Sequence, residues 1–262
     1  AINMTFGNTK YPLVTDSTGF VQKNMTLSAS RNLGIYTIFW DYNGYDYYLP
    51  ATQEQTLMVV ASTSILIESD PDVLVGESFG FSGRIVDDMG NPLSTNLNFR
   101  FHGQYVETLS TNSDGQFVHE YLVPHYTEAG PNTITIQYIP EEFYLPSSST
   151  WQLQVYHNTR IEMAEFEGVL NSTVPISGFV YDKVDRPIEG LSVRLVMDSD
   201  FPVDGVTDGN GMFSIPVHIP FGTELGYHNL TATFAGNDYY IYNSTESRIF
   251  IKIGRASCRE RV

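Results

Sequence analysis

Residues 130–144 have the sequence GPNTITIQYIPEEFY, in which Ile134, Ile136 and Tyr138 alternate with polar side chains. Apolar residues at every second position are typical of a β-strand with one buried and one exposed face. The pattern occurs again 96 residues earlier, as GIYTIFWDYNGYDYY at 34–48, and 96 residues later, as GYHNLTATFAGNDYY at 226–240. The chain therefore contains one strand-and-turn unit three times at a constant spacing.

Further positions share this spacing and define a repeat. They are Thr15, Thr111 and Thr207; Gly19, Gly115 and Gly211; and Tyr48, Tyr144 and Tyr240. A fixed period is the sequence signature of a repeat protein. We divide the chain into a first segment, residues 1–62, which matches the C-terminal half of a truncated repeat, and two whole repeats, the second segment (63–158) and the third segment (159–252). A domain cut at its middle cannot complete its core, so we expect the first segment to be poorly ordered or to expose apolar surface.

Each repeat contains alternating apolar strands separated by turns rich in Gly, Asn and Asp. The turn sequences are DMGNP at 88–92, NSDG at 112–115 and DGNG at 208–211. Gly supplies the positive φ of such turns, and Asn and Asp side chains bond to their own backbone. No long stretch has helical periodicity. We predict an all-β fold of tandem immunoglobulin-like β-sandwich domains with about seven strands each.

The charge of the chain excludes some partners. Its 262 residues include 30 acidic and 14 basic side chains, for a net charge of -16. A protein that binds nucleic acid through its backbone needs an excess of Lys and Arg, so no nucleic-acid partner is expected. The same charge disfavours anionic membranes, and no apolar run reaches the length of a membrane span.

The last ten residues, 253–262, differ abruptly in composition from the rest. They have the sequence IGRASCRERV and contain the only cysteine, Cys258. We interpret this stretch as the translation of a sequencing adapter and not as a domain. The remaining chain has no cysteine, so we expect no disulfide bond.

Several motifs resemble those of a known group of proteins. In the second segment they are FSGRIVD at 81–87, NPL at 91–93 and TNSDGQF at 111–117; in the third they are ISGFVYD at 176–182, RPI at 186–188 and AGNDYY at 235–240. These motifs resemble the immunoglobulin-like tandem repeats of bacterial and archaeal cell-surface proteins. The resemblance extends over residues 1–252 and implies an extracellular or cell-surface location. Such modules serve as spacers, adhesins and appendages of enzymes, so it specifies the fold better than the function.

No catalytic constellation is found, and we expect the chain not to be an enzyme. The main hypothesis is a non-catalytic spacer or stalk, because only three residues separate Val155 from Thr159 and three residues span about 10 Å. The alternatives are an adhesin that binds a glycan or protein through loops or edge strands, and accessory repeats of a surface enzyme whose catalytic domain lies outside this chain. The expected partners are neighbouring repeats and, for an adhesin, surface glycans or proteins. The recurring tyrosines, Tyr48, Tyr144 and Tyr240, are interpreted as closing the end of the sandwich core rather than as a ligand platform that stacks on sugars.

Two other kinds of site are weighed. No cofactor is expected, and calcium is the weaker alternative, because Asp-rich turns are most often only turns. The calcium candidates are Asp70, Asp72, Asp87, Asp88 and Asp114. Five Asn-x-Ser/Thr motifs mark candidate sites of N-glycosylation, at Asn3, Asn24, Asn171, Asn229 and Asn243.

Overall fold

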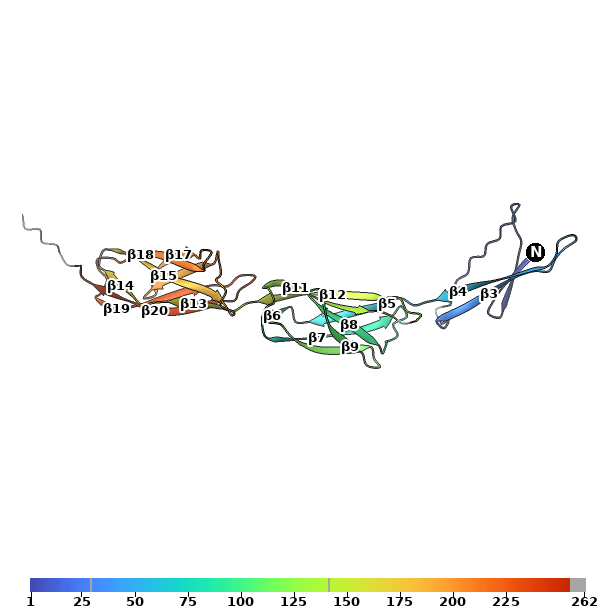
Figure 1. The fold of residues 1–262 in the computed structure, drawn as a ribbon, viewed down its shortest axis with the longest axis horizontal. Helices are drawn as coiled ribbons and strands as arrows, with labels where there is room; N and C mark the ends of the chain where they lie inside the picture. The colour runs from blue at the N-terminus through green and yellow to red at the C-terminus, as the bar shows by residue number, and fades with distance from the viewer. Residues whose placement is uncertain (29, 141, 255–262) are drawn as a thin grey trace, which may run out of the picture. The chain divides into compact units, whose positions relative to one another are not determined.

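The computed structural model describes residues 1–28, 30–140 and 142–254, and every regular element in this part of the chain is a β-strand. Figure 1 shows these strands and the loops that join them. The tail from residue 255 onward, with Cys258, lies outside the described residues. The interpretation of that tail as an adapter translation therefore stays a prediction. The described part contains no helix of the length and apolarity that a membrane span requires.

The third segment has a complete two-sheet architecture. Its strands are β13 (Thr159–Met163), β14 (Phe166–Val169), β15 (Thr173–Asp182), β16 (Ser192–Met197), β17 (Asp200–Val206), β18 (Met212–His218), β19 (Gly226–Phe234) and β20 (Asn243–Lys252). One sheet has the order β13-β15-β18 and the other β14-β20-β19-β16-β17. The pairs are antiparallel except β14 with β20, which run parallel. This is the strand order of an immunoglobulin-like sandwich.

The segment has eight strands where the sequence predicted about seven. The extra strand arises because the first one is divided: β13 pairs with β15 in one sheet, and β14 pairs with β20 in the other. A short break between Met163 and Phe166 therefore moves the chain from one sheet to the other.

The core of the third segment lies between its two sheets. Ile176 and Ile215 come from the three-stranded sheet, Leu195 and Leu230 come from the five-stranded sheet, and all four belong to one buried apolar cluster. The predicted alternation is confirmed in β19, where Leu230 and Ala232 are fully buried and Thr231 and Thr233, which follow each of them, are partly exposed. Burial of a Leu or Ile side chain contributes about 1.5–3 kcal/mol, so these inward rows hold the sandwich together.

The second segment repeats this topology. Its strands are β5 (Thr63–Ser69), β6 (Asp72–Leu74), β7 (Ser78–Asp87), β8 (Asn96–Phe101), β9 (Gln104–Ser110), β10 (Gln116–Leu122), β11 (Gly130–Tyr138) and β12 (Ser147–Tyr156). The sheets have the orders β10-β7-β5 and β6-β12-β11-β8-β9. Phe81 of the first sheet and Phe99 of the second pack with ring centroids 4.9 Å apart, so the two sheets enclose a common core.

The first segment is a single sheet. It consists of β1 (Ile2–Phe6), β2 (Thr9–Leu13), β3 (Gly34–Tyr42) and β4 (Ala51–Val59), in the order β2-β1-β3-β4. This order matches β9-β8-β11-β12 of the second segment. Residues 20–26, which correspond to the whole of β10, form no strand. The expected exposure of apolar surface holds for part of this sheet: Ile38 and Trp40 are partly exposed, whereas Met4 and Phe6 are buried.

The contacts of the chain group it into two compact units. One comprises Ala1–Ser69, Gly80–His119 and Thr133–Trp151, and the other Asp70–Phe79, Glu120–Asn132 and the described residues from Gln152 onward. The second unit thus includes one end of the second segment together with the whole third segment. The domain boundaries at residues 62, 158 and 252 stay a prediction.

Candidate functional site

The recurring threonine closes one edge of each complete sandwich. The hydroxyl of Thr111 donates to the carbonyl of Leu93 at 2.7 Å and accepts from the backbone N–H of Thr95 at 2.7 Å. Thr207 forms the corresponding bonds, to the carbonyl of Ile188 at 2.7 Å and from the N–H of Leu191 at 2.9 Å. Both threonines are buried. The period of the sequence therefore reflects equivalent structural environments, and these threonines are structural.

The recurring glycine has a backbone and packing role. Gly115 and Gly211 have φ of 71° and 72°, in the left-handed region that favours glycine. A Cβ atom at Gly115 would lie 2.4 Å from the carbonyl oxygen of Ile85, and one at Gly211 would lie 2.6 Å from that of Val180. The turn thus folds against its neighbouring strand at a distance that only glycine permits.

The linker before the third segment forms a joint with that segment. His157 donates its backbone N–H to the carbonyl of Tyr239 at 2.9 Å, and its carbonyl accepts from Ile241 at 3.1 Å. At the equivalent place before the second segment, Ala61 makes the same two bonds, with Phe143 at 2.9 Å and Leu145 at 2.8 Å. Each linker residue is therefore hydrogen-bonded into the loop before the last strand of the segment that follows it.

The side chain of His157 adds contacts that Ala61 lacks. It is 1% exposed, its Nε2 lies 2.8 Å from the carbonyl oxygen of Thr127, and its Nδ1 lies 3.5 Å from a carboxylate oxygen of Asp182. Its ring also packs edge-on against Tyr240, with centroids 6.2 Å apart. These contacts all lie within the second compact unit and connect the loop at Thr127 to the third segment.

The electrostatics of this joint centre on Asp182. Burial raises the pKa of its carboxyl, but hydrogen bonds from the backbone and side chain of Arg186 and from the backbone of Val184 outweigh that effect, and the pKa lies below its ordinary value. Burial, together with the negative charge of Asp182, raises the pKa of Tyr240. Tyr240 packs against the core of the third segment, as expected for a residue that closes the sandwich end.

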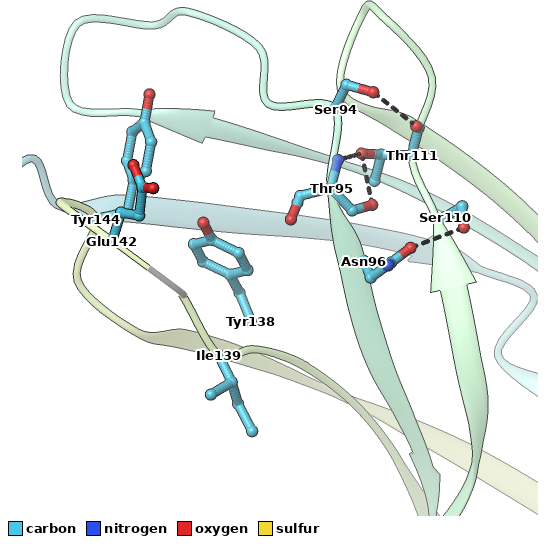
Figure 2. A pocket seen from close by; sticks show the side chains of 9 residues that line it. All are labelled: Ser94, Thr95, Asn96, Ser110, Thr111, Tyr138, Ile139, Glu142 and Tyr144. Atoms are coloured by element: carbon cyan, nitrogen blue, oxygen red, sulfur yellow. Dashed lines mark hydrogen bonds between the residues drawn. The ribbon is translucent and has the colours of Figure 1, made fainter.

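A hollow of about 590 Å³ lies at the equivalent end of the second segment (Figure 2). One wall comes from the start of β8 and the end of β9, where Thr95, Asn96 and Ser110 lie. The other comes from the loop after β11, where Glu142 and Tyr144 lie. Figure 2 shows Tyr138 between these walls with its hydroxyl directed along the hollow. No sequence motif indicates this hollow, because its polar residues come from the ends of two strands and from a separate loop.

The calcium candidates are placed in turns and strand ends. Asp87 binds its own turn: one carboxylate oxygen accepts from the backbone of Met89 and Asn91 at 2.9 and 2.8 Å, and the other accepts from the Asn91 amide at 2.9 Å. Asp70, Asp72, Asp88 and Asp114 are exposed. Within the described residues no group of three or more His, Cys, Asp or Glu side chains is arranged to hold a metal ion. Calcium binding stays an untested alternative.

The five sequon asparagines differ in accessibility. Asn24, Asn171 and Asn229 are exposed. In contrast, the side-chain amide of Asn243 donates to the carbonyl of Thr159 at 2.7 Å, and that of Asn3 donates to Asp41 at 3.0 Å. Glycosylation at any of the five stays a prediction, and the geometry favours the three exposed ones.

Comparison with solved structures gives structural neighbours of low sequence identity. No family model matches the chain, and no curated protein matches it. Among solved structures, the Escherichia coli adhesin FdeC is 15% identical with a TM-score of 0.46, and the match covers 84% of this chain and 74% of that one. Immunoglobulin domains 1–4 of Sidekick-1 are 10% identical with a TM-score of 0.46, over 96% of this chain and 67% of that one. A 1.5-MDa bacterial ice-binding adhesin is 11% identical with a TM-score of 0.35, over 97% and 86%. The immunoglobulin-like assignment here depends on the strand order of the chain itself.

Proposed function

We propose that this chain is a non-catalytic structural spacer of an extracellular or cell-surface protein. The observation that carries the proposal is the construction of the linkers. Val155 and Thr159 belong to consecutive strands, and the backbone of His157 between them is hydrogen-bonded on both sides to the loop at Tyr239 and Ile241. A linker this short, with its polar groups already paired, has little freedom to act as a hinge.

The composition supports the same function. An excess of 16 negative charges makes neighbouring molecules repel one another and keeps them soluble. The resemblance of the repeat motifs to those of surface proteins supports the location. A spacer requires stable modules and stiff connections, and the two complete sandwiches with their short, hydrogen-bonded linkers support this function.

Double electron–electron resonance spectroscopy measures the stiffness of the second linker, which joins Val155 to Thr159. Spin labels are attached at Val118→Cys and Phe221→Cys, two positions that are 84% and 80% exposed, in a chain with Cys258→Ser. We expect one narrow distance distribution. A matched control inserts four Gly and Ser residues after Asn158 and should broaden it. A broad distribution in the unmodified chain would contradict the spacer function.

A further inference from the structure

The hollow of the second segment has a polar lining and lies at a segment end whose strand order recurs in the third segment. Thr111 and Tyr144 mark the same positions as Thr207 and Tyr240, so the two segment ends are directly comparable. At the positions of Thr95, Ser110 and Tyr138, the third segment has Leu191, Val206 and Phe234. Three hydroxyl groups are thus replaced by apolar side chains while the strand framework stays the same.

The framework does not need these hydroxyls, because the third segment folds without them. The bonds at this edge that recur in the third segment are those of Thr111 and of backbone groups, with Thr207 in the place of Thr111 there. Within the described residues, no group hydrogen-bonds the hydroxyl of Thr95, the carboxylate of Glu142 or the hydroxyl of Tyr144. The Asn96 amide oxygen accepts from Ser110 at 2.8 Å, an arrangement that turns its Nδ2 group away from that bond (Figure 2). The hollow therefore has both donors and acceptors available.

The lining indicates the chemical class of the ligand. Its volume of about 590 Å³ is within the range of sites that hold small molecules. No Lys, Arg or His lines it, so it has no group that would pair with an anion, and Glu142 would repel one. Hydroxyl and amide groups can hydrogen-bond the hydroxyls of a ligand, and a tyrosine ring can pack against an apolar C–H face. The lining therefore suits a compact ring that carries many hydroxyls and has such a face.

We propose that this hollow binds a neutral saccharide unit. The side chains of Thr95, Asn96 and Glu142 would hydrogen-bond the sugar hydroxyls, and Tyr144 would contact its ring. The second segment would then contribute binding as well as length, whereas the third segment, with Leu191 and Val206 at the matching positions, would contribute length only.

The test uses the full chain and named sugars. Methyl glycosides of glucose, galactose, mannose and N-acetylglucosamine are titrated while amide resonances are followed by NMR, with N-acetylneuraminic acid and glucuronic acid as charged comparisons. We expect at least one neutral glycoside to give saturable shifts confined to residues 94–96, 110–111 and 138–144. No saturable shifts there with any neutral sugar, or stronger binding of the acidic sugars, would overturn the proposal.

The matched variant transfers the third segment's residues to the second. Thr95→Leu with Ser110→Val should fold normally, since Leu191 and Val206 occupy those positions in an intact sandwich, and should weaken binding about tenfold or more because hydrogen-bonding groups are lost. The control is Ser214→Val, an exposed strand position outside the hollow, which should leave binding unchanged. Binding that survives in the double variant, with its amide spectrum otherwise intact, would also overturn the proposal.

Discussion

The first and third segments contain the same four-stranded sheet, but only the third has a second sheet packed on it. The sheet β2-β1-β3-β4 matches the order β17-β16-β19-β20. Leu230 of β19 is fully buried, whereas Ile38, its counterpart in β3, is partly exposed. Strand formation and pairing are thus properties of the local sequence. Without a partner sheet the inward side chains of β3 are less buried, although Met4 and Phe6 of β1 are buried in the first segment as well.

The turns at Asp16 and Asp208 also form in both segments and differ only in their packing. Asp16 accepts hydrogen bonds from the backbone of Thr18 and Phe20 at 2.8 and 3.0 Å, as Asp208 does from Asn210 and Met212 at 2.8 and 2.9 Å. Yet a Cβ atom at Gly19 would meet no atom within 4 Å, whereas one at Gly211 would meet the carbonyl of Val180. The turn forms in both segments, but it packs against a neighbouring strand only in the complete one.

The largest expected difference concerns the inward row. Leu230→Ala should lower the free energy of unfolding of the third segment by about 2–5 kcal/mol, because a fully buried side chain leaves a cavity. Ile38→Ala should cost about 1 kcal/mol in the first segment, since its side chain is only partly removed from water. Hydrogen exchange at increasing urea concentrations measures each segment separately. Equal losses of unfolding free energy in the two variants would show that the two side chains are equally buried, contrary to this prediction.

The next effect concerns the turn glycine. Gly211→Ala should destabilise the third segment by about 2–4 kcal/mol, through a left-handed backbone and an added clash with the carbonyl of Val180. Gly19→Ala carries the backbone cost alone, about 1–2 kcal/mol. Hydrogen exchange, followed separately in the first and third segments as each variant is unfolded by heat, compares the two losses of stability. An equal or larger loss at Gly19 would contradict the packing role of Gly211.

A smaller effect is expected at the linker. His157→Ala gives the second linker the residue that the first has in Ala61, and it removes the bond to the carbonyl of Thr127. The loss should be about 1–2 kcal/mol and should appear as faster hydrogen exchange in residues 124–129. His218→Ala, at an exposed strand position, is the control and should change nothing. Unaltered exchange at 124–129 in His157→Ala would show that the side chain does not stabilise the joint.

The smallest effect concerns pH. Burial lowers the pKa of His228, but hydrogen bonds to Asp198 and to the carbonyl of Glu224 outweigh it, so its pKa is raised. The charged imidazole then stabilises the third segment fully below the ordinary histidine pKa of about 6.5, and this contribution is lost as the pH rises through the raised value. The Tm difference between the wild type and His228→Gln should therefore shrink as the pH rises from 5 to 9. A difference that stays constant with pH would exclude this role.

The sequence predicted the fold more completely than the candidate sites. Alternation in residues 133–138 and the recurrence of Thr111 and Gly115 are local or periodic signals, and they suffice for strands, turns and repeats. The division of the first strand into β13 and β14 left no such signal, because it depends on which sheet each part joins. The hollow and the contacts of His157 were also missed, since residues distant in sequence form them only after the sandwich has closed.

The most direct test of the account compares hydrogen exchange of three equivalent strands in one experiment. Strands β3, β11 and β19 are the same strand in three copies, and only the latter two are covered by a second sheet. We therefore expect slow exchange in β11 (Gly130–Tyr138) and β19 (Gly226–Phe234), and much faster exchange in β3 (Gly34–Tyr42). Equal protection of all three strands, or fast exchange in β19, would contradict this expectation.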